Sequence, residues 1–128
     1  MSKQYSISQV RDFIRYGTYP DSPTLIDDWL AQDRCCLMSR RSSQCSGCSY
    51  QVQREAYEQQ FRLLLEAIMD ELNPRHWRCT CLNNIFKPLF SLQNLAYTAA
   101  SKAHVKQLYY ELSTTVQYTA ASLNACYE

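Results

Sequence analysis

Apolar side chains recur every three to four residues along most of this chain, which is the period of a helix and not of a strand. The clearest stripe predicts one long helix over residues 49–72, ended by Pro74 after Asn73. Its apolar positions are Val52, Ala56, Tyr57, Phe61, Leu64, Leu65, Ile68 and Leu72. We expect this stripe to face the core, and its width with Leu63 and Met69 also permits a dimer interface.

Two shorter helices are predicted before the long one. The first lies between Ser6 and Gly17, because Ser6 and Gln9 match a capping box and glycine accepts the left-handed conformation that often follows a last turn. The second is capped by Ser22 and is expected to end near Met38, where polar and small residues begin.

The C-terminal half predicts further helices. A short one is expected at residues 82–86, after the segment RHWRCTC, and another begins at Leu89, after Pro88. No glycine or proline interrupts the apolar period beyond Leu89, so the last two apolar stretches could form one long helix. Together these patterns predict a single all-α domain over residues 1–128, a compact bundle of four to six helices with a cysteine-rich loop.

Composition agrees with this fold class. The chain has 128 residues, of which 46% are hydrophobic, but only two glycines and four prolines, too few turn residues for an all-β fold. We see no apolar run of transmembrane length and no signal peptide, so we expect the protein inside a cell, where disulfides are rare. The net charge is +1, but residues 34–54 hold four arginines and residues 72–110 hold five Lys or Arg, with no acid in either segment.

The seven cysteines are the strongest chemical signal in the chain. The segment 35–48 contains a C-x-x-C with glycine between its cysteines, and the segment 76–81 reads H-x-x-C-x-C. The C-x-x-C spacing lets two thiolates bind one tetrahedral ion, so we predict zinc in a structural site. The candidate ligands are Cys35, Cys36, Cys45, Cys48, His76, Cys79 and Cys81. The alternative is a set of buried thiols, which suits Cys36 and Cys126 well.

The predicted helix at 49–72 separates the two cysteine segments by about 30–36 Å, at about 1.5 Å per residue. Three arrangements therefore remain open. One is a local site in 35–48 with a single ligand folded back, the second is a site shared between chains of an antiparallel dimer, and the third is two separate sites. We favour the local site. We also expect a homodimer, formed through the helix at 49–72 or through the C-terminal helix.

Catalytic motifs are missing from the sequence: there is no nucleophile elbow, phosphate loop or H-E-x-x-H. We therefore expect a non-enzymatic protein that binds a host protein or RNA and has no small-molecule substrate. Arginine side chains near the predicted metal could bind phosphates, and a tryptophan ring there could stack on a base. These residues are Arg40, Arg41, Arg75, Trp77 and Arg78. Against RNA as the partner, the net charge is near zero and lysines are few.

Residues 91–100, SLQNLAYTAA, resemble a BC box, the helix that recruits elongin in cullin ubiquitin ligases, and SLQNLA is similar to the version in lentiviral Vif proteins. The family pattern needs Leu92, a small residue at Ala96 and an aliphatic one at Ala100. This resemblance implies a protein-binding site at Leu92, Leu95 and Ala96 and an alternative function as a ubiquitin-ligase adaptor. No cullin box follows, and a helix that turns its Leu and Ala residues toward the core would show the same pattern.

A wider resemblance rests on CC at 35–36, CSGC at 45–48 and HWRCTC at 76–81, together with a mass of 15.0 kDa. In these features the chain resembles the small cysteine-rich accessory proteins of plant positive-strand RNA viruses, such as the 15-kilodalton orphan protein of citrus leprosis virus and other cileviruses. The resemblance implies a zinc-supported helical fold and a place in the cytoplasm or nucleus of the infected plant cell. It also implies a role against RNA silencing or another host defence.

Overall fold

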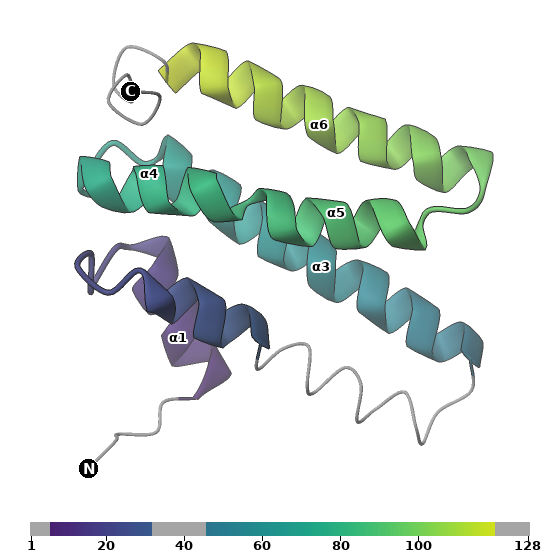
Figure 1. Cartoon of the computed structure of the whole chain (residues 1–128), viewed down its shortest axis with the longest axis horizontal. Coiled ribbons are helices and arrows are strands. Elements are labelled where there is room, and N and C mark those ends of the chain that lie inside the picture. Colours follow the sequence, from purple (N-terminus) through teal and green to yellow (C-terminus); the bar gives the residue numbers. More distant parts are fainter. Residues whose placement is uncertain (1–5, 32–45, 120–128) are drawn as a thin grey trace.

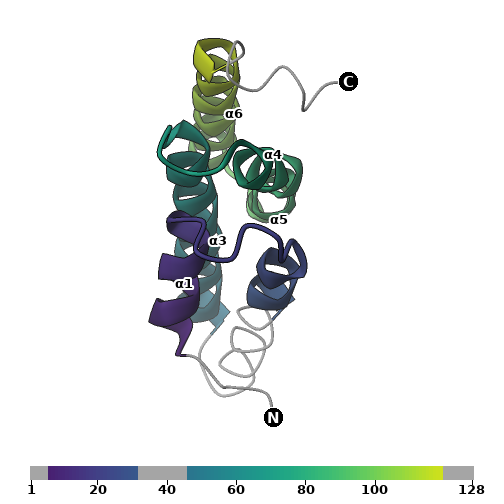
Figure 2. The same ribbon diagram turned by 90° about the vertical axis from the view of Figure 1, so that its left-hand side faces the viewer.

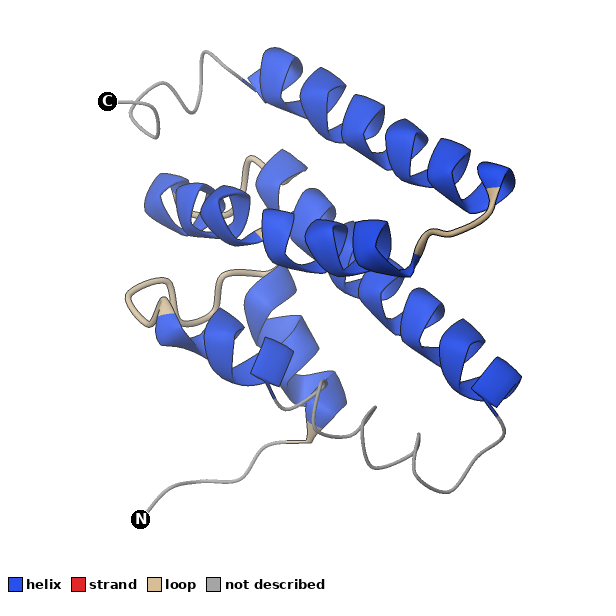
Figure 3. Ribbon diagram, turned by 45° about the vertical axis from the view of Figure 1, so that its right-hand side comes forward, coloured by secondary structure: helices blue, strands red, loops and turns tan. Residues whose placement is uncertain are grey.

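In the computed structural model, which describes residues 6–31 and 46–119, the long helix α3 (Ser46–Met69) is the element against which the other helices pack. These are α1 (Ile7–Arg15), α4 (Arg75–Asn84), α5 (Phe86–Leu95) and α6 (Ala99–Thr119). Residues 24–31 are also helical. The regular secondary structure of these ranges is entirely helical, which confirms the all-α prediction (Figure 1, Figure 3).

One apolar core joins these helices. Its fully buried side chains include Ile14, Ile26, Trp29, Phe61, Leu64, Ile68, Trp77, Ile85, Leu89 and Leu108. Helix α1 lies on one side of α3, whereas α5 and the helix at 24–31 lie on another (Figure 2). Helix α6 runs antiparallel to α5 and contacts both α5 and α3 (Figure 1). Within the described ranges, no helix is both long and apolar enough to span a membrane.

Helix α1 begins and ends as its local sequence predicts. Ser6 Oγ accepts the Gln9 N–H at 3.2 Å and the Ser6 N–H donates to Gln9 Oε1 at 2.9 Å, which confirms the capping box. At the other end Gly17 has a φ of +58°, and the Thr18 N–H donates to the Phe13 carbonyl at 3.0 Å. This is the Schellman arrangement, for which the left-handed glycine is needed.

Helix α3 ends at Met69 and not at Leu72 as we expected. The chain turns there because Asp70 Oδ1 accepts the Leu72 N–H at 2.9 Å, a local bond that competes with continued helix. Leu72 consequently leaves the apolar stripe, and it is 94% exposed. The remaining C-terminal members of the stripe are buried as predicted; these are Phe61, Leu64, Leu65 and Ile68.

The segment RHWRCTC forms the first seven residues of α4, so the prediction of a helix that begins only after it and covers residues 82–86 is wrong. The inward positions of α4 are Trp77, Arg78, Cys81 and Leu82, and the charged residue among them hides the helical period. Helices α4 and α5 follow each other with only Ile85 between them. Pro88 explains this break, because it lacks the N–H that would bond the carbonyl of Asn84 four residues earlier.

Helices α5 and α6 are separate, so the alternative of one long C-terminal helix is wrong. Thr98 Oγ1 accepts the Ser101 N–H at 3.0 Å, and the Thr98 N–H donates to Ser101 Oγ at 3.0 Å. This pair is a reciprocal N-terminal cap with serine in the position that glutamate usually takes. The spacing T-x-x-S was therefore the sequence signal for a new helix after Thr98.

Candidate functional site

Residues 73–78, where the sequence predicted part of a nucleic-acid surface, close the C-terminal ends of two helices instead. The last carbonyls of any helix lack partners within that helix. The Trp77 Nε1–H donates to the Ile14 carbonyl of α1 at 2.7 Å, and the Arg78 Nε–H donates to the Ile68 carbonyl of α3 at 2.7 Å. The guanidinium also lies at the negative end of α3, where a cation is favourable.

Asn73 joins the same two helix ends. Its Nδ2 group donates to the Arg15 carbonyl of α1 at 2.9 Å and to the Ala67 carbonyl of α3 at 3.0 Å. We call Asn73, Trp77 and Arg78 the C-cap junction. We had treated Asn73 only as a helix stop, but an amide with two N–H donors directly after a helix end was the signal for this role.

An ion pair lies beside the C-cap junction. Arg15 Nη1 is 2.8 Å from Asp70 Oδ2, and Arg15 Nε is 3.4 Å from Glu66 Oε2. The hydrogen bond from Arg15, helped by the one from the Leu72 N–H, holds the pKa of Asp70 below its ordinary value. The same hydrogen bond raises the pKa of Arg15. Both groups therefore stay charged at neutral pH and tie α1 to the end of α3.

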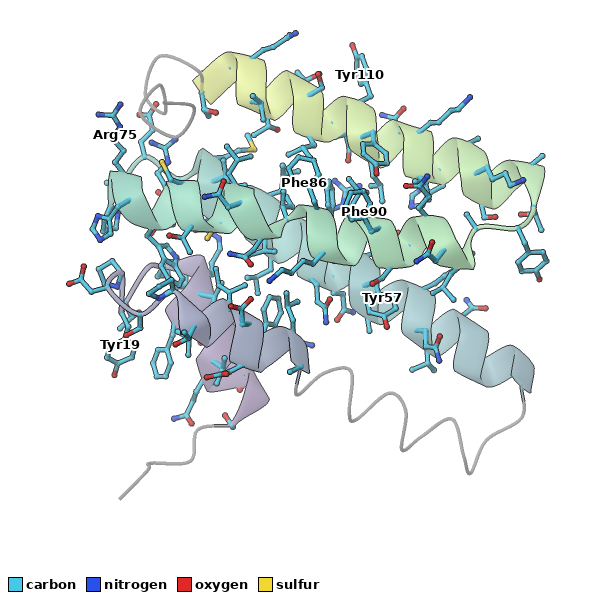
Figure 4. The ribbon with its side chains drawn as sticks, in the orientation of Figure 1. Tyr19, Tyr57, Arg75, Phe86, Phe90 and Tyr110 are labelled. Carbon is cyan, nitrogen blue, oxygen red and sulfur yellow. The ribbon has the colours of Figure 1, made fainter. Side chains whose placement is uncertain are left out.

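Burial removes two residues from the predicted nucleic-acid surface. Trp77 is 0% exposed, so its indole cannot stack on a base, and Arg78 is 4% exposed. The predictions for these two residues are wrong, because their aromatic and cationic groups cap helices inside the protein. Arg75 is exposed at the start of α4 and stays a candidate phosphate contact (Figure 4). Arg40 and Arg41 lie outside the described residues.

His76, Cys79 and Cys81 do not converge on one ion, because residues two apart in a helix point about 200° apart. Cys81 is a fully buried free thiol, and burial raises its pKa to about 12. It is a core residue, and its prediction as a zinc ligand is wrong. Cys79 is half-buried and disulfide-bonded, so its sulfur is not a free thiolate. His76 is exposed, with Nε2 at 3.2 Å from Asp21 Oδ1.

The described residues do not test the zinc prediction for the other cysteines. Within residues 6–31 and 46–119, no group of three or more His, Cys, Asp or Glu side chains could hold a metal ion. Cys35, Cys36 and Cys45 lie outside the described residues, as does the side chain of Cys48. Zinc binding in the segment 35–48 therefore stays a prediction.

The structure contradicts the BC-box hypothesis for residues 91–100. Leu92 is 3% exposed and packs in the core, so it cannot enter a partner's pocket. Helix α5 ends at Leu95, and Ala96 has the extended angles φ −80° and ψ 109°, so the ten residues are not one helix. Leu95 and Ala96 are half-buried. The core explanation of this pattern fits better, and the predicted protein-binding site here is wrong.

The sequence did not single out the exposed aromatic rings of α5. Phe86 and Phe90 are 39% and 54% exposed, and their ring centroids lie 6.2 Å apart. Both rings lie on the side of α5 that faces α6, whereas Tyr110 points away from α5 on the outer side of α6 (Figure 4). Apolar residues four apart on a helix usually face the core, so the pattern gave no sign of this exposure.

Helix α6 completes this surface. The Tyr109 O–H donates to Gln93 Oε1 at 3.0 Å, which sets the register of the antiparallel helices. Seven residues further along α6, Val116 comes level with Phe86, which precedes Gln93 by seven residues. Tyr109 and Val116 are half-buried and pack against the core. We call Phe86, Phe90, Tyr109 and Val116 the aromatic strip.

A second surface is an open groove of about 1140 Å³ between α1 and α3. Its lining is mainly charged, and the exposed side chains of Tyr16 and Met69 add apolar surface. Two polar pairs on the α3 side of this groove connect to α6. His104 Nε2 lies 2.6 Å from Glu58 Oε1, and Arg62 Nη1 lies 2.7 Å from Glu111 Oε2.

Comparisons with known proteins add no assignment to these surfaces: no family model, no curated protein and no solved structure matches the chain. The fold defines an all-α protein.

Proposed function

We propose that this chain is a non-enzymatic accessory protein of a plant virus, which counters host defence by binding a host protein through the aromatic strip. The observation that carries this proposal is the exposure of Phe86 and Phe90 on a helix whose other face is firmly packed. Pro88, Leu89 and Leu92 of α5 are buried, so the two rings are held in place on a rigid support. Rigid exposed aromatic side chains are typical anchors of protein interfaces.

A host protein suits this surface better than RNA. Binding to RNA needs several cations that can reach phosphates, but Arg78 is buried and Lys87 is paired with Asp27. The phenyl rings of Phe86 and Phe90 are also tilted by 34° toward each other, so they do not form a row of parallel faces for successive bases. The viral resemblance implies suppression of RNA silencing, and we propose that the protein achieves it by binding a host protein.

Zinc and location belong to the same proposal. A structural zinc ion held by Cys35 or Cys36 with Cys45 and Cys48 would fix the start of α3, and thiolates suit zinc chemically. We propose that the protein acts in the cytoplasm or nucleus of the host cell, as the resemblance to plant-virus accessory proteins implies.

Site-specific photocrosslinking tests this function. The photoreactive amino acid p-benzoylphenylalanine is placed at Phe90, the protein is expressed in plant cells, and adducts formed under ultraviolet light are identified by mass spectrometry. We expect discrete host-protein adducts from position 90, lost when Phe86→Ser is added. Leu72 is the matched control position, because it is 94% exposed and belongs to the turn after α3, not to the aromatic strip. The same adducts from positions 72 and 90, or adducts mainly with RNA, would contradict the proposal.

A further inference from the structure

The groove-facing side of α3 carries a regular row of charges. Arg54, Glu58, Arg62 and Glu66 follow each other at intervals of four residues, and all four line the groove between α1 and α3. Four residues advance a helix by about 400°, which is about 40° more than a full turn, so the row is about 18 Å long and winds by about 120° around α3. Their signs alternate along the row. We call these residues the charge row.

From this pattern we propose that the chain forms a symmetric homodimer, in which the charge rows of two copies lie antiparallel to each other. Reversing the row turns its order of signs around, so each charge meets an opposite one. With the two-fold axis level with residue 60, Arg54 faces Glu66 of the second copy and Glu58 faces Arg62 of the second copy. Two-fold symmetry then supplies each of these pairs twice.

The contacts within one chain leave the charge row accessible. The side chains of Arg62 and Glu66 are 42% and 65% exposed, although each already has a partner within the chain. Arg54 has no carboxylate partner among the described residues. A carboxylate has room for more than one cation, so Glu66 can keep Arg15 and accept Arg54 of a second copy. Arg54 is therefore the member of the charge row that would gain its first carboxylate partner on dimerisation.

The same groove offers apolar surface for such a dimer. Tyr16 is 61% exposed and Met69 is 51% exposed, and both line the groove. Exposed ion pairs contribute little affinity, so apolar contacts would drive association while the charge row sets the register and the antiparallel direction. A second copy is the occupant that carries the reversed charge pattern by necessity. The row itself sums to zero charge, so it gives a polyanion such as RNA no net attraction.

A simpler role for the charge row is the support of α3 alone, because opposite charges four residues apart stabilise a single helix. Charge exchange separates the two roles. In Arg54→Glu, positions 54 and 66 of the two copies bring two carboxylates together. In Glu66→Arg, the same positions bring two guanidinium groups together. By sedimentation velocity over a concentration series, we expect each variant alone to dimerise more weakly than the wild type by about tenfold or more, because like charges repel across the interface.

Restoration is the decisive part of the test. A 1:1 mixture of the two variants should form a heterodimer, since each interface then pairs a carboxylate with a guanidinium. The double variant Arg54→Glu/Glu66→Arg should regain the homodimer for the same reason. Lys106→Glu, a charge reversal on the exposed side of α6, is the matched control and should dimerise like the wild type. Arg54→Gln and Glu66→Gln replace the reversals if a reversed charge disturbs the fold. These variants remove a charge without adding repulsion, so each should weaken dimerisation less than the corresponding reversal.

Three results would each overturn the inference. The first is a wild-type protein that stays monomeric throughout the concentration series. The second is a set of single variants, folded by circular dichroism, that dimerise as tightly as the wild type, which would place the interface elsewhere. The third is a mixture and a double variant that stay as weak as the single variants. Crosslinking from the aromatic strip is independent of all three.

Discussion

Helices α4 and α5 have ten residues each and are separated by a single residue, yet they use their side chains in opposite ways. In α4, the indole of Trp77, the guanidinium of Arg78 and the thiol of Cys81 are buried. In α5, the plain phenyl rings of Phe86 and Phe90 are exposed. The residues with the richest chemistry thus complete the core, and the chemically simplest aromatic residues form the surface that we assign to binding.

The neighbours of each helix explain this difference. Helix α4 starts beside the C-terminal ends of α1 and α3, whose last carbonyls need hydrogen-bond donors. Trp77, Arg78 and Asn73 supply those donors. Helix α5 packs against the middle of α3, where the backbone is already bonded and apolar contact is sufficient. On the side toward α6, Gln93 bonds Tyr109, and the rings of Phe86 and Phe90 on that side stay exposed.

Truncation of Trp77 should have the largest effect. We expect Trp77→Ala to lower the free energy of unfolding by about 3–5 kcal/mol, because it leaves a large cavity, and to free the Ile14 carbonyl. Trp77→Phe keeps most of the ring but still removes the N–H donor, at about 1–3 kcal/mol. Equilibrium urea unfolding followed by circular dichroism measures both. If Trp77→Ala were as stable as Leu72→Ala, whose side chain is exposed, the C-cap junction would not have the role described.

A methyl group at Gly17 should disturb the same junction from the side of α1. A Cβ atom there would lie 3.0 Å from Trp77 Cδ1 and 3.2 Å from Pro74 Cδ, and the φ of +58° is unfavourable for alanine. We expect Gly17→Ala to destabilise the protein by more than about 1 kcal/mol. Thr18→Ala, at the exposed next residue, is the control and should stay near the wild type in the same urea titration. Equal stability of the two variants would contradict this packing.

The Arg15–Asp70 pair should make the junction sensitive to acid. The pKa of Asp70 is lowered in the folded protein, so its contribution is present above the ordinary carboxyl range and is lost as the pH falls through the folded value. We expect Asp70→Asn to be less stable than the wild type at pH 7, with a gap that narrows below about pH 4. Urea midpoints from pH 7 to pH 2 test this. A gap that stays constant with pH would exclude the ion pair as the cause.

Polar substitution on the aromatic strip should have the smallest effect on stability. We expect Phe90→Ser to change the free energy of unfolding by less than about 0.5 kcal/mol, because its ring is half in solvent. Leu89→Ala, one residue away but fully buried, should cost about 2–5 kcal/mol. A Phe90→Ser variant as unstable as Leu89→Ala would mean that the ring belongs to the core.

Local signals explain which parts of the fold the sequence could predict. The start and end of α1 depend on Ser6, Gln9 and Gly17, which act on their own neighbours, so both ends were predicted correctly. The end of α3 was misplaced because Asp70 and Asn73 stop the helix through side-chain bonds that the apolar period does not reveal. Helix α4 was missed because its inward face includes a charged residue whose partner is a distant carbonyl.

The candidate sites show a different limit. The sequence assigned Trp77 and Arg78 to nucleic acid and Cys81 to zinc, and these assignments failed because the direction of each side chain depends on the helix around it and on what that helix faces. An H-x-x-C-x-C can converge in a loop and diverges in a helix, so its meaning changed once α4 was placed. Phe86 and Phe90 were missed for the reverse reason, since their spacing is that of core residues. Zinc binding in the segment 35–48 stays a prediction.

Hydroxyl-radical footprinting of the native protein tests the contrast between α4 and α5 most directly, because it reports the exposure of each side chain in one experiment. Tryptophan reacts readily when it is accessible, so protection of Trp77 is informative. The account predicts that Phe86 and Phe90 are oxidised in the native state, and that Trp77 is protected until urea unfolds the chain. Rapid oxidation of Trp77 in the native protein, together with protection of both phenylalanines, would contradict it.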